Sequence, residues 1–228
     1  MASETYERIL EGLADPKTRF RALADLPQSN VRNAAPIAAP FLRDEDPEVR
    51  FFALECLLAR GSKRYAERVL PLLRDPDELV RVSAVECVAR WNVREAWRRV
   101  LRLLRDRDAL VRSYAAWALK ELGAAGAVPK LRNRLGRERN AEVKAALLEA
   151  LAVLDDDDTC ARRLEKLLKH PDKNVRGTAA NCVVGVADYG KPEQFRRLRR
   201  SLEEAVLAER DEGVRTRLRQ DLDIFLED

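Results

Sequence analysis

The sequence predicts an all-α protein, a right-handed solenoid of about seven helical hairpins, on three observations. The stretch Leu73–Ala84 recurs 31 residues earlier at Leu42–Ala53 and 31 residues later at Leu104–Ala115. Each copy has apolar or small residues at positions i, i+4, i+7 and i+8, which is the spacing of one helix face. An Asp-Pro or Asp-X-Asp turn occurs at the same place in each copy, where it ends one helix and caps the next. A fixed period of this size indicates a continuous repeat array.

The repeat extends over nearly the whole chain. It is already present at Asp15–Leu23, continues with one-residue slips at Asn140–Lys144 and Asp172–Ala179, and ends with a longer step of 39 residues to Val214. We therefore expect a single repeat domain over residues 1–228, with units at approximately 3–30, 31–61, 62–92, 93–124, 125–156, 157–189 and 190–228.

Glycines and prolines mark the ends and bends of the expected helices. Gly61 and Gly123 fall at equivalent helix ends, as C-caps do. Pro40 and Pro71 share a column inside the first helix of their repeats, where a proline is expected to bend the helix.

The composition suits a long array of amphipathic helices, with 46% hydrophobic and 36% charged residues among 228. The 43 basic and 39 acidic residues are close to balance, so charge alone does not indicate nucleic acid. The N-terminus is polar and no apolar run approaches the roughly 20 residues of a membrane span, which predicts a cytoplasmic protein without a membrane partner. Cys56, Cys87 and Cys182 share one buried helix position, which indicates core thiols in a reducing compartment.

The most specific feature of the repeat is an aspartate followed six residues later by an arginine, at Asp44 and Arg50, Asp75 and Arg81, and Asp106 and Arg112. With this pattern and its short period, the chain resembles HEAT-repeat proteins, and in particular the HEAT-like units of phycobilisome lyases. In HEAT arrays such residues form a ladder of hydrogen bonds between neighbouring repeats, so the resemblance implies a structural ladder here that also includes Arg176. Later copies depart from the pattern, with Glu138 and Lys144, His170 and Arg176, and Glu209 and Arg215.

The resemblance also implies that the second helices line a concave surface. Counted from Val49, the residues three and six positions on point away from the core, and they place aromatic side chains between carboxylates. The expected partner-binding residues are Phe52, Glu55, Glu86, Tyr114, Trp117, Glu149 and Asn181. Such a patch suits a basic or amphipathic peptide. The alternative is that the aromatics pack between repeats and the glutamates are ordinary solvated residues.

The first helices of the later repeats carry the opposite charge. Their basic residues are Arg98, Arg99, Arg102, Arg105, Lys130, Arg132, Arg134, Arg137, Arg162, Arg163, Lys166, Lys169, Arg196, Arg197, Arg199 and Arg200. They would contact phosphates or, as the favoured alternative, solvate a convex face and cover apolar surface with their stems.

Catalytic and metal motifs are missing from the sequence. The run Asp155–Asp158 lacks the spacing of a calcium loop and favours a helix cap and turn. His170 is the only histidine and occupies the ladder position, which favours local hydrogen bonding. We find no P-loop, no dinucleotide-binding glycine pattern, no Cys/His zinc spacing and no nucleophile elbow. We therefore expect no catalytic residue, no metal and no cofactor.

These observations predict a non-catalytic scaffold, acting as a monomer, that binds a protein or peptide of basic character. Two alternatives stay open. HEAT-like alkylpurine DNA glycosylases are similar in length and use a carboxylate beside aromatics, as Trp117 lies near Glu86 and Glu149 in the expected groove, but that groove is acidic and would repel phosphates. Bilin lyases or their chaperones share the short repeat, although no residue here can be matched to a catalytic one.

Overall fold

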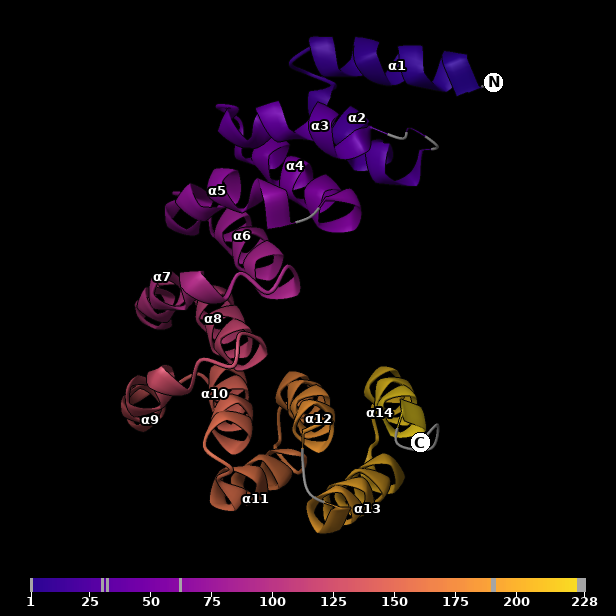
Figure 1. The fold of residues 1–228 in the computed structure, drawn as a ribbon. Coiled ribbons are helices and arrows are strands. Elements are labelled where there is room, and N and C mark those ends of the chain that lie inside the picture. Colours follow the sequence, from indigo (N-terminus) through magenta and orange to yellow (C-terminus); the bar gives the residue numbers. More distant parts are fainter. Residues whose placement is uncertain (1, 30, 32, 62, 190–191, 225–228) are drawn as a thin grey trace. The chain divides into compact units, whose positions relative to one another are not determined.

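The computed structural model describes residues 2–29, 31, 33–61, 63–189 and 192–224. Over these residues the chain forms fourteen α-helices and seven short 3-10 helices, with no β-strand (Figure 1). The all-α, hairpin-repeat fold class is confirmed. The chain divides into two compact units, Met1–Leu103 and Leu104–Asp228, which we describe separately.

Unit 1 consists of three helical hairpins and one further helix. Its α-helices are α1 (Ala2–Ala14), α2 (Arg19–Asp25), α3 (Ala34–Ala38), α4 (Pro47–Arg60), α5 (Ala66–Val69), α6 (Glu78–Arg90) and α7 (Trp97–Arg102). Its 3-10 helices are η1 (Leu26–Gln28), η2 (Ala39–Arg43), η3 (Lys63–Tyr65), η4 (Leu70–Arg74) and η5 (Arg94–Ala96), and η6 (Leu103–Arg105) begins at its end. Helix α1 packs on α2, α3 on α4 and α5 on α6, while α2, α4 and α6 pack side by side as one layer.

Unit 2 consists of one helix followed by three hairpins. Its elements are α8 (Ala109–Glu121), η7 (Ala125–Ala127), α9 (Val128–Arg137), α10 (Ala141–Leu154), α11 (Asp158–Leu167), α12 (Lys173–Ala187), α13 (Pro192–Ala208) and α14 (Glu212–Ile224). Helices α8, α10, α12 and α14 contact one another in sequence and form an inner layer. Figure 1 shows α9, α11 and α13 on the outer side of this layer. At 17 residues, α13 is the longest helix described and accounts for the longer last step of the repeat.

The turns before the second helices are held by side-chain caps, as the sequence predicted. Asp46 accepts a hydrogen bond from the backbone N–H of Glu48, and Asp77 accepts from the N–H groups of Leu79 and Val80. The same cap is made by Asp108, Asn140 and Asp172. Each cap satisfies backbone donors that the first helical turn leaves unpaired.

The predicted glycine and proline positions also have a structural role. Gly61 is the C-cap of α4, and Gly123 follows α8 with φ of +62°, a conformation that favours glycine. At Pro40 and Pro71 the chain changes from α-helix to 3-10 helix, because proline has no N–H to continue the α-helical bonds. The expected bend therefore takes the form of a tighter last turn.

Small and branched apolar residues fill the interior of both units. In the second helix of the second hairpin, Val49, Ala53, Cys56 and Leu57 are at most 1% exposed. All four cysteines are free and buried, which confirms core thiols. Burial raises the pKa of the Cys56 thiol to about 11, so this thiol stays protonated and unreactive at neutral pH. Among the described residues, no helix has both the length and the apolarity that crossing a membrane requires.

In unit 1 a forked arginine contact links consecutive repeats. The Arg50 guanidinium donates to both carboxylate oxygens of Asp75, at 2.8 and 2.7 Å, and to the carbonyls of Asp44 and Glu45 in its own turn. Asp75 accepts in addition the N–H of Asp77, so one carboxylate shapes its own turn and binds the preceding repeat. Arg19 also reaches the next repeat, but it donates to a single oxygen of Asp44, at 2.6 Å, while its Nε donates to the carbonyl of Leu13.

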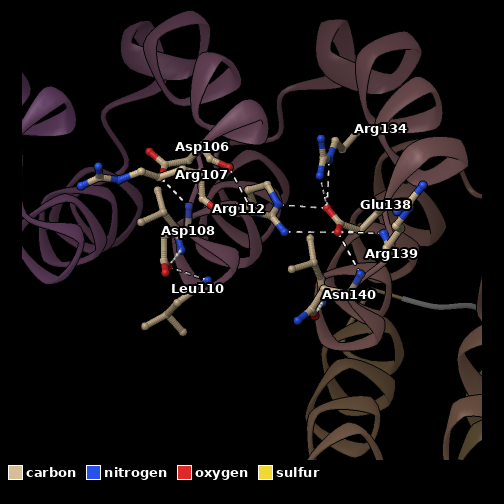
Figure 2. Close-up of polar contacts among 11 residues, drawn as sticks. Asp106, Arg107, Asp108, Leu110, Arg112, Arg134, Glu138, Arg139 and Asn140 are labelled. Atoms are coloured by element: carbon tan, nitrogen blue, oxygen red, sulfur yellow. Dashed lines mark hydrogen bonds and ion pairs between the residues drawn. The ribbon is translucent and has the colours of Figure 1, made fainter.

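In unit 2 glutamate takes the place of aspartate in these contacts. Arg112 donates to Glu138 at 3.0 and 3.2 Å and to the carbonyl of Asp106, while Arg134 approaches Glu138 from its own helix (Figure 2). Arg176 donates to Glu209 at 2.6 and 2.7 Å.

His170 occupies the acid position of the sixth copy. Its Nδ1 accepts the N–H of Asp172 at 3.1 Å, which confirms the predicted local hydrogen bond. The ring accepts the N–H of the turn as the acid does in other copies, but it has no carboxylate for an arginine of the preceding repeat to bind.

Replacing Arg50 with alanine is expected to destabilise unit 1. The Asp75 side chain is 4% exposed and would lose its cationic partner. Because breaking a buried ion pair costs about 3–5 kcal/mol, we expect the free energy of unfolding to fall by about 3 kcal/mol in urea denaturation followed by circular dichroism. Arg43→Ala, at an exposed position of η2, is the control and should change it by less than about 0.5 kcal/mol. Equal effects of the two substitutions would contradict this role of Arg50.

Glu138 and Glu209 are expected to make unit 2 sensitive to acid. Burial alone would raise the pKa of Glu138, but hydrogen bonds from Arg112 and Arg134 outweigh this effect and lower the pKa to about 2. The hydrogen bond from Arg176 lowers the pKa of Glu209 to about 2 as well. Since both values lie below the unfolded value of 4.5, this stabilisation is complete above pH 4.5 and is lost as the pH falls towards 2.

The urea midpoint measured between pH 6 and pH 2 tests this dependence. The variant Glu138→Gln/Glu209→Gln keeps the side-chain length but not the charge, so it should be less stable at neutral pH and show a shallower acid dependence. A slope equal to that of the unmodified protein would show that other groups control the acid response.

Candidate partner-binding surfaces

In unit 1, the predicted aromatic residue Phe52 lies half-exposed on α4. Its ring centroid is 6.2 Å from that of Phe20 on α2 and 5.1 Å from that of Phe51. Phe52 therefore takes part in packing between neighbouring repeats and presents the remainder of its ring to solvent. The packing interpretation is confirmed for Phe52, and partner binding by the exposed part of its ring stays a prediction.

The two carboxylates predicted beside Phe52 have different partners. Glu55 accepts a hydrogen bond from the Ser83 hydroxyl at 2.8 Å, a contact from α4 to α6. Glu86 forms an ion pair with Arg90 one turn later on α6, at 2.8 Å. Glu55 is bonded to a neutral donor and keeps its negative charge available, whereas the charge of Glu86 is offset by an exposed arginine.

In unit 2, Tyr114 and Trp117 form an aromatic pair on α8. Their ring centroids lie 5.9 Å apart with an interplanar angle of 71°, an edge-to-face arrangement, and both side chains are half-exposed. Asn181 is exposed on α12 of the same inner layer. Tyr189, two residues after the end of α12, is 58% exposed.

The expectation that Glu149 lines an open groove is wrong. Its residue is only 5% exposed, and its Oε1 accepts a hydrogen bond from Lys120 Nζ at 2.6 Å across α8 and α10. Lys120 itself is 6% exposed and also contacts Glu121 at 2.9 Å. Burial disfavours the ammonium, but the Glu149 and Glu121 carboxylates outweigh it and raise the pKa of Lys120. Burial also raises the pKa of Glu149, although Lys120 acts in the opposite direction.

Gly185 on α12 provides the space for this ion pair. A Cβ at this position would lie 2.1 Å from Glu149 Oε1 and 3.1 Å from Lys120 Nζ. The Tyr189 ring covers the pair from outside, with its centroid 5.5 Å from Lys120 Nζ. Sequence reasoning missed Lys120, Gly185 and Tyr189, although a glycine in the interior of an expected helix was a signal of close approach.

Six of the basic residues predicted on the outer helices of unit 2 are paired with carboxylates. Arg132 contacts Asp155 and Asp157, Arg162 contacts Asp158, and Arg197 contacts Asp158 and Glu165. Arg134, Arg199 and Arg200 pair with glutamates on or directly after their own helices. At these six positions, pairing with acids favours the solvating interpretation over phosphate binding.

The aspartate run serves the helix start and these arginines. Asp157 caps α11 by accepting the N–H groups of Thr159 and Cys160, as the turn interpretation predicted. Its neighbours Asp155 and Asp158 bind arginines. Among the residues that the structure describes, no group of three or more His, Cys, Asp or Glu side chains is arranged to hold a metal ion.

The family of the chain follows from a match to the HEAT-repeat model at residues 6–75 and 66–152. These segments together cover more than half of the sequence, so the chain belongs to the HEAT-repeat family. No curated protein sequence matches the chain.

Solved structures show the same fold at low sequence identity. One chain of the complex of CpcE and CpcF of phycocyanin lyase from Nostoc sp. PCC7120 is similar with a TM-score of 0.68 and 18% identity, over 96% of this chain and 94% of that chain. Kap121p bound to Ste12p is similar with a TM-score of 0.59 and 15% identity, over 90% of this chain and 25% of that chain. This chain therefore spans about a quarter of Kap121p.

Gly185→Ala tests the arrangement around the buried pair. The added methyl group must displace the Glu149 carboxylate, and we expect a loss of about 1–2 kcal/mol in the free energy of unfolding, as for overpacked cores. Gly177→Ala on the same helix is the matched control, because its Cβ would meet only Arg217 Nη1 at 3.8 Å. This control should gain up to about 1 kcal/mol from helix propensity. Urea denaturation of both variants provides the comparison, and effects of the same sign would contradict the assignment.

Proposed function

We propose that this HEAT-repeat protein is a non-catalytic scaffold that binds a protein or peptide on the exposed side of its second helices. The observation that carries the proposal is the edge-to-face pair of Tyr114 and Trp117, which stays half-exposed on the inner layer of unit 2. Aromatic residues on a rigid surface are the common anchors of protein interfaces.

The proposed binding residues are revised from those predicted. In unit 1 they are Phe52, Glu55 and Glu86. In unit 2 they are Tyr114, Trp117, Asn181 and Tyr189, while Glu149 is assigned to the interior. The Lys120–Glu149 pair links α8, which carries Tyr114 and Trp117, to α10 through a charge-assisted hydrogen bond of 2.6 Å.

The proposed partner is a segment with apolar side chains and basic character. Half-exposed rings provide apolar contact area, and the carboxylate of Glu55 is bonded only to the neutral Ser83 hydroxyl among its described contacts, so it can still attract a cation. The similar solved structures include a complex of CpcE with CpcF and a complex of Kap121p with Ste12p, which agrees with protein binding at the level of the fold.

Partner capture with single-site variants tests the proposal. The full-length protein is immobilised, exposed to a lysate of its source cells, and the retained proteins are quantified by mass spectrometry. Trp117→Ala probes unit 2 and Glu86→Arg probes unit 1. Loss of an anchoring aromatic is expected to weaken binding about 10- to 100-fold.

Arg163→Ala on the exposed side of α11 is the control and should retain the same partners. All variants are first compared by circular dichroism to establish that they are folded. Unchanged recovery of every retained protein in both Trp117→Ala and Glu86→Arg would overturn the proposed surface.

A further inference from the structure

A hollow of about 470 Å³ lies in unit 2, away from the aromatic pair. It is formed by the turn between α11 and α12, and by the last turn of α13 with the residues after it. Its volume lies within the range of small-ligand sites, about 300–1,000 Å³. Neither the predicted groove nor the proposed function uses this part of the protein.

One wall of the hollow is apolar. Leu168 and Pro171 contribute from the turn before α12, and Ala205 and Ala208 from α13. Leu207, next to Ala208 on α13, is 87% exposed. This is the most exposed large apolar side chain among the described residues.

The floor of the hollow has no free charge. Arg176 and Glu209 pair there at 2.6 and 2.7 Å, and the remaining Arg176 donor binds the carbonyls of His170 and Pro171. Glu209 also accepts the N–H groups of Arg210 and Asp211. These groups are mutually satisfied and would not recognise a ligand.

The rim, in contrast, carries uncompensated cations. Lys169 and Arg210 are exposed, line the hollow, and form no ion pair with any residue that the structure describes. The acidic lining residue Glu204 pairs with Arg200 at 3.4 Å. His170 adds a hydrogen-bond donor at Nε2, because its Nδ1 accepts the N–H of Asp172.

We propose that this hollow binds a short segment of a partner protein in which apolar side chains lie next to carboxylates. The apolar side chains occupy the wall of Leu168, Ala205 and Ala208. The carboxylates face Lys169 and Arg210. This charge preference is opposite to that proposed for the second helices, so the two surfaces would bind different segments.

Two features of the array change at this step. His170 stands where other copies have an acid, and α13 extends for 17 residues. The lining contains both His170 and the last turn of α13, and it contains no residue of α8.

The single histidine allows a direct test by NMR. The full-length protein, labelled at the His170 ring, is titrated with the peptide acetyl-Asp-Leu-Leu-Asp-amide, and the imidazole resonances are followed at constant pH. Saturable shifts are expected. The peptides acetyl-Lys-Leu-Leu-Lys-amide and acetyl-Asp-Ser-Ser-Asp-amide remove the charge match and the apolar groups in turn, and each should bind at least about tenfold more weakly, equivalent to about 1.4 kcal/mol.

Variants of the lining residues locate the binding. Lys169→Glu/Arg210→Glu should lower the affinity at least about tenfold, and Ala208→Trp, which fills the hollow from an exposed position, should abolish the saturable shift. Lys166→Glu/Arg219→Glu makes the same charge change at exposed positions outside the hollow and should leave the affinity within about twofold.

Equal binding of the acidic and basic leucine peptides, or unchanged binding by Ala208→Trp, would overturn the proposal. An absence of any shift would do so as well. Trp117→Ala should bind the acidic peptide normally, so a failure of the aromatic surface and a failure of the hollow are distinguishable.

Discussion

The stacking of repeats in each unit depends on the forked arginine contact. Arg50 binds two carbonyls of its own turn and the carboxylate of Asp75 in the next repeat, so the shape of the turn and the position of the neighbouring hairpin are set by one guanidinium. A planar group with donors in fixed directions accepts only a narrow range of geometries. Its main contribution is therefore to the register between hairpins, since the desolvation of both charges offsets much of their attraction.

Once the register is fixed, the remaining surface of each second helix is free to differ between repeats. The same outward column contains Phe52 and Tyr114 at two copies but Ser83 and Ala146, both buried, at two others. The next column contains Glu55, which bonds Ser83, and Glu149, which bonds Lys120 in the interior. Residues that share a repeat position thus have different environments, because the neighbouring helix supplies a different partner in each case.

This difference explains what the sequence could and could not predict. The caps at Asp46 and Asp77, the core column of Val49 and Ala53, and the buried thiols follow from local and periodic rules that need no knowledge of neighbours. The burial of Glu149 required Lys120 from α8, 29 residues earlier, and the missing side chain of Gly185 on α12, which comes one repeat later. Counting along one helix assigned Glu149 to solvent for that reason.

Whether a basic side chain can bind a ligand also depends on which residue the neighbouring segment places beside it. Arg132, Arg162 and Arg197 are on outer helices and look equivalent to Lys169 in the sequence, yet each of the three is held by an aspartate or glutamate. Lys169 has no such partner among the described residues and borders an apolar hollow. An uncompensated charge next to apolar surface is the combination that favours a ligand of opposite charge, because binding then gains electrostatic attraction together with apolar burial. In this array, recognition is therefore expected where the regular pairing of charges is interrupted.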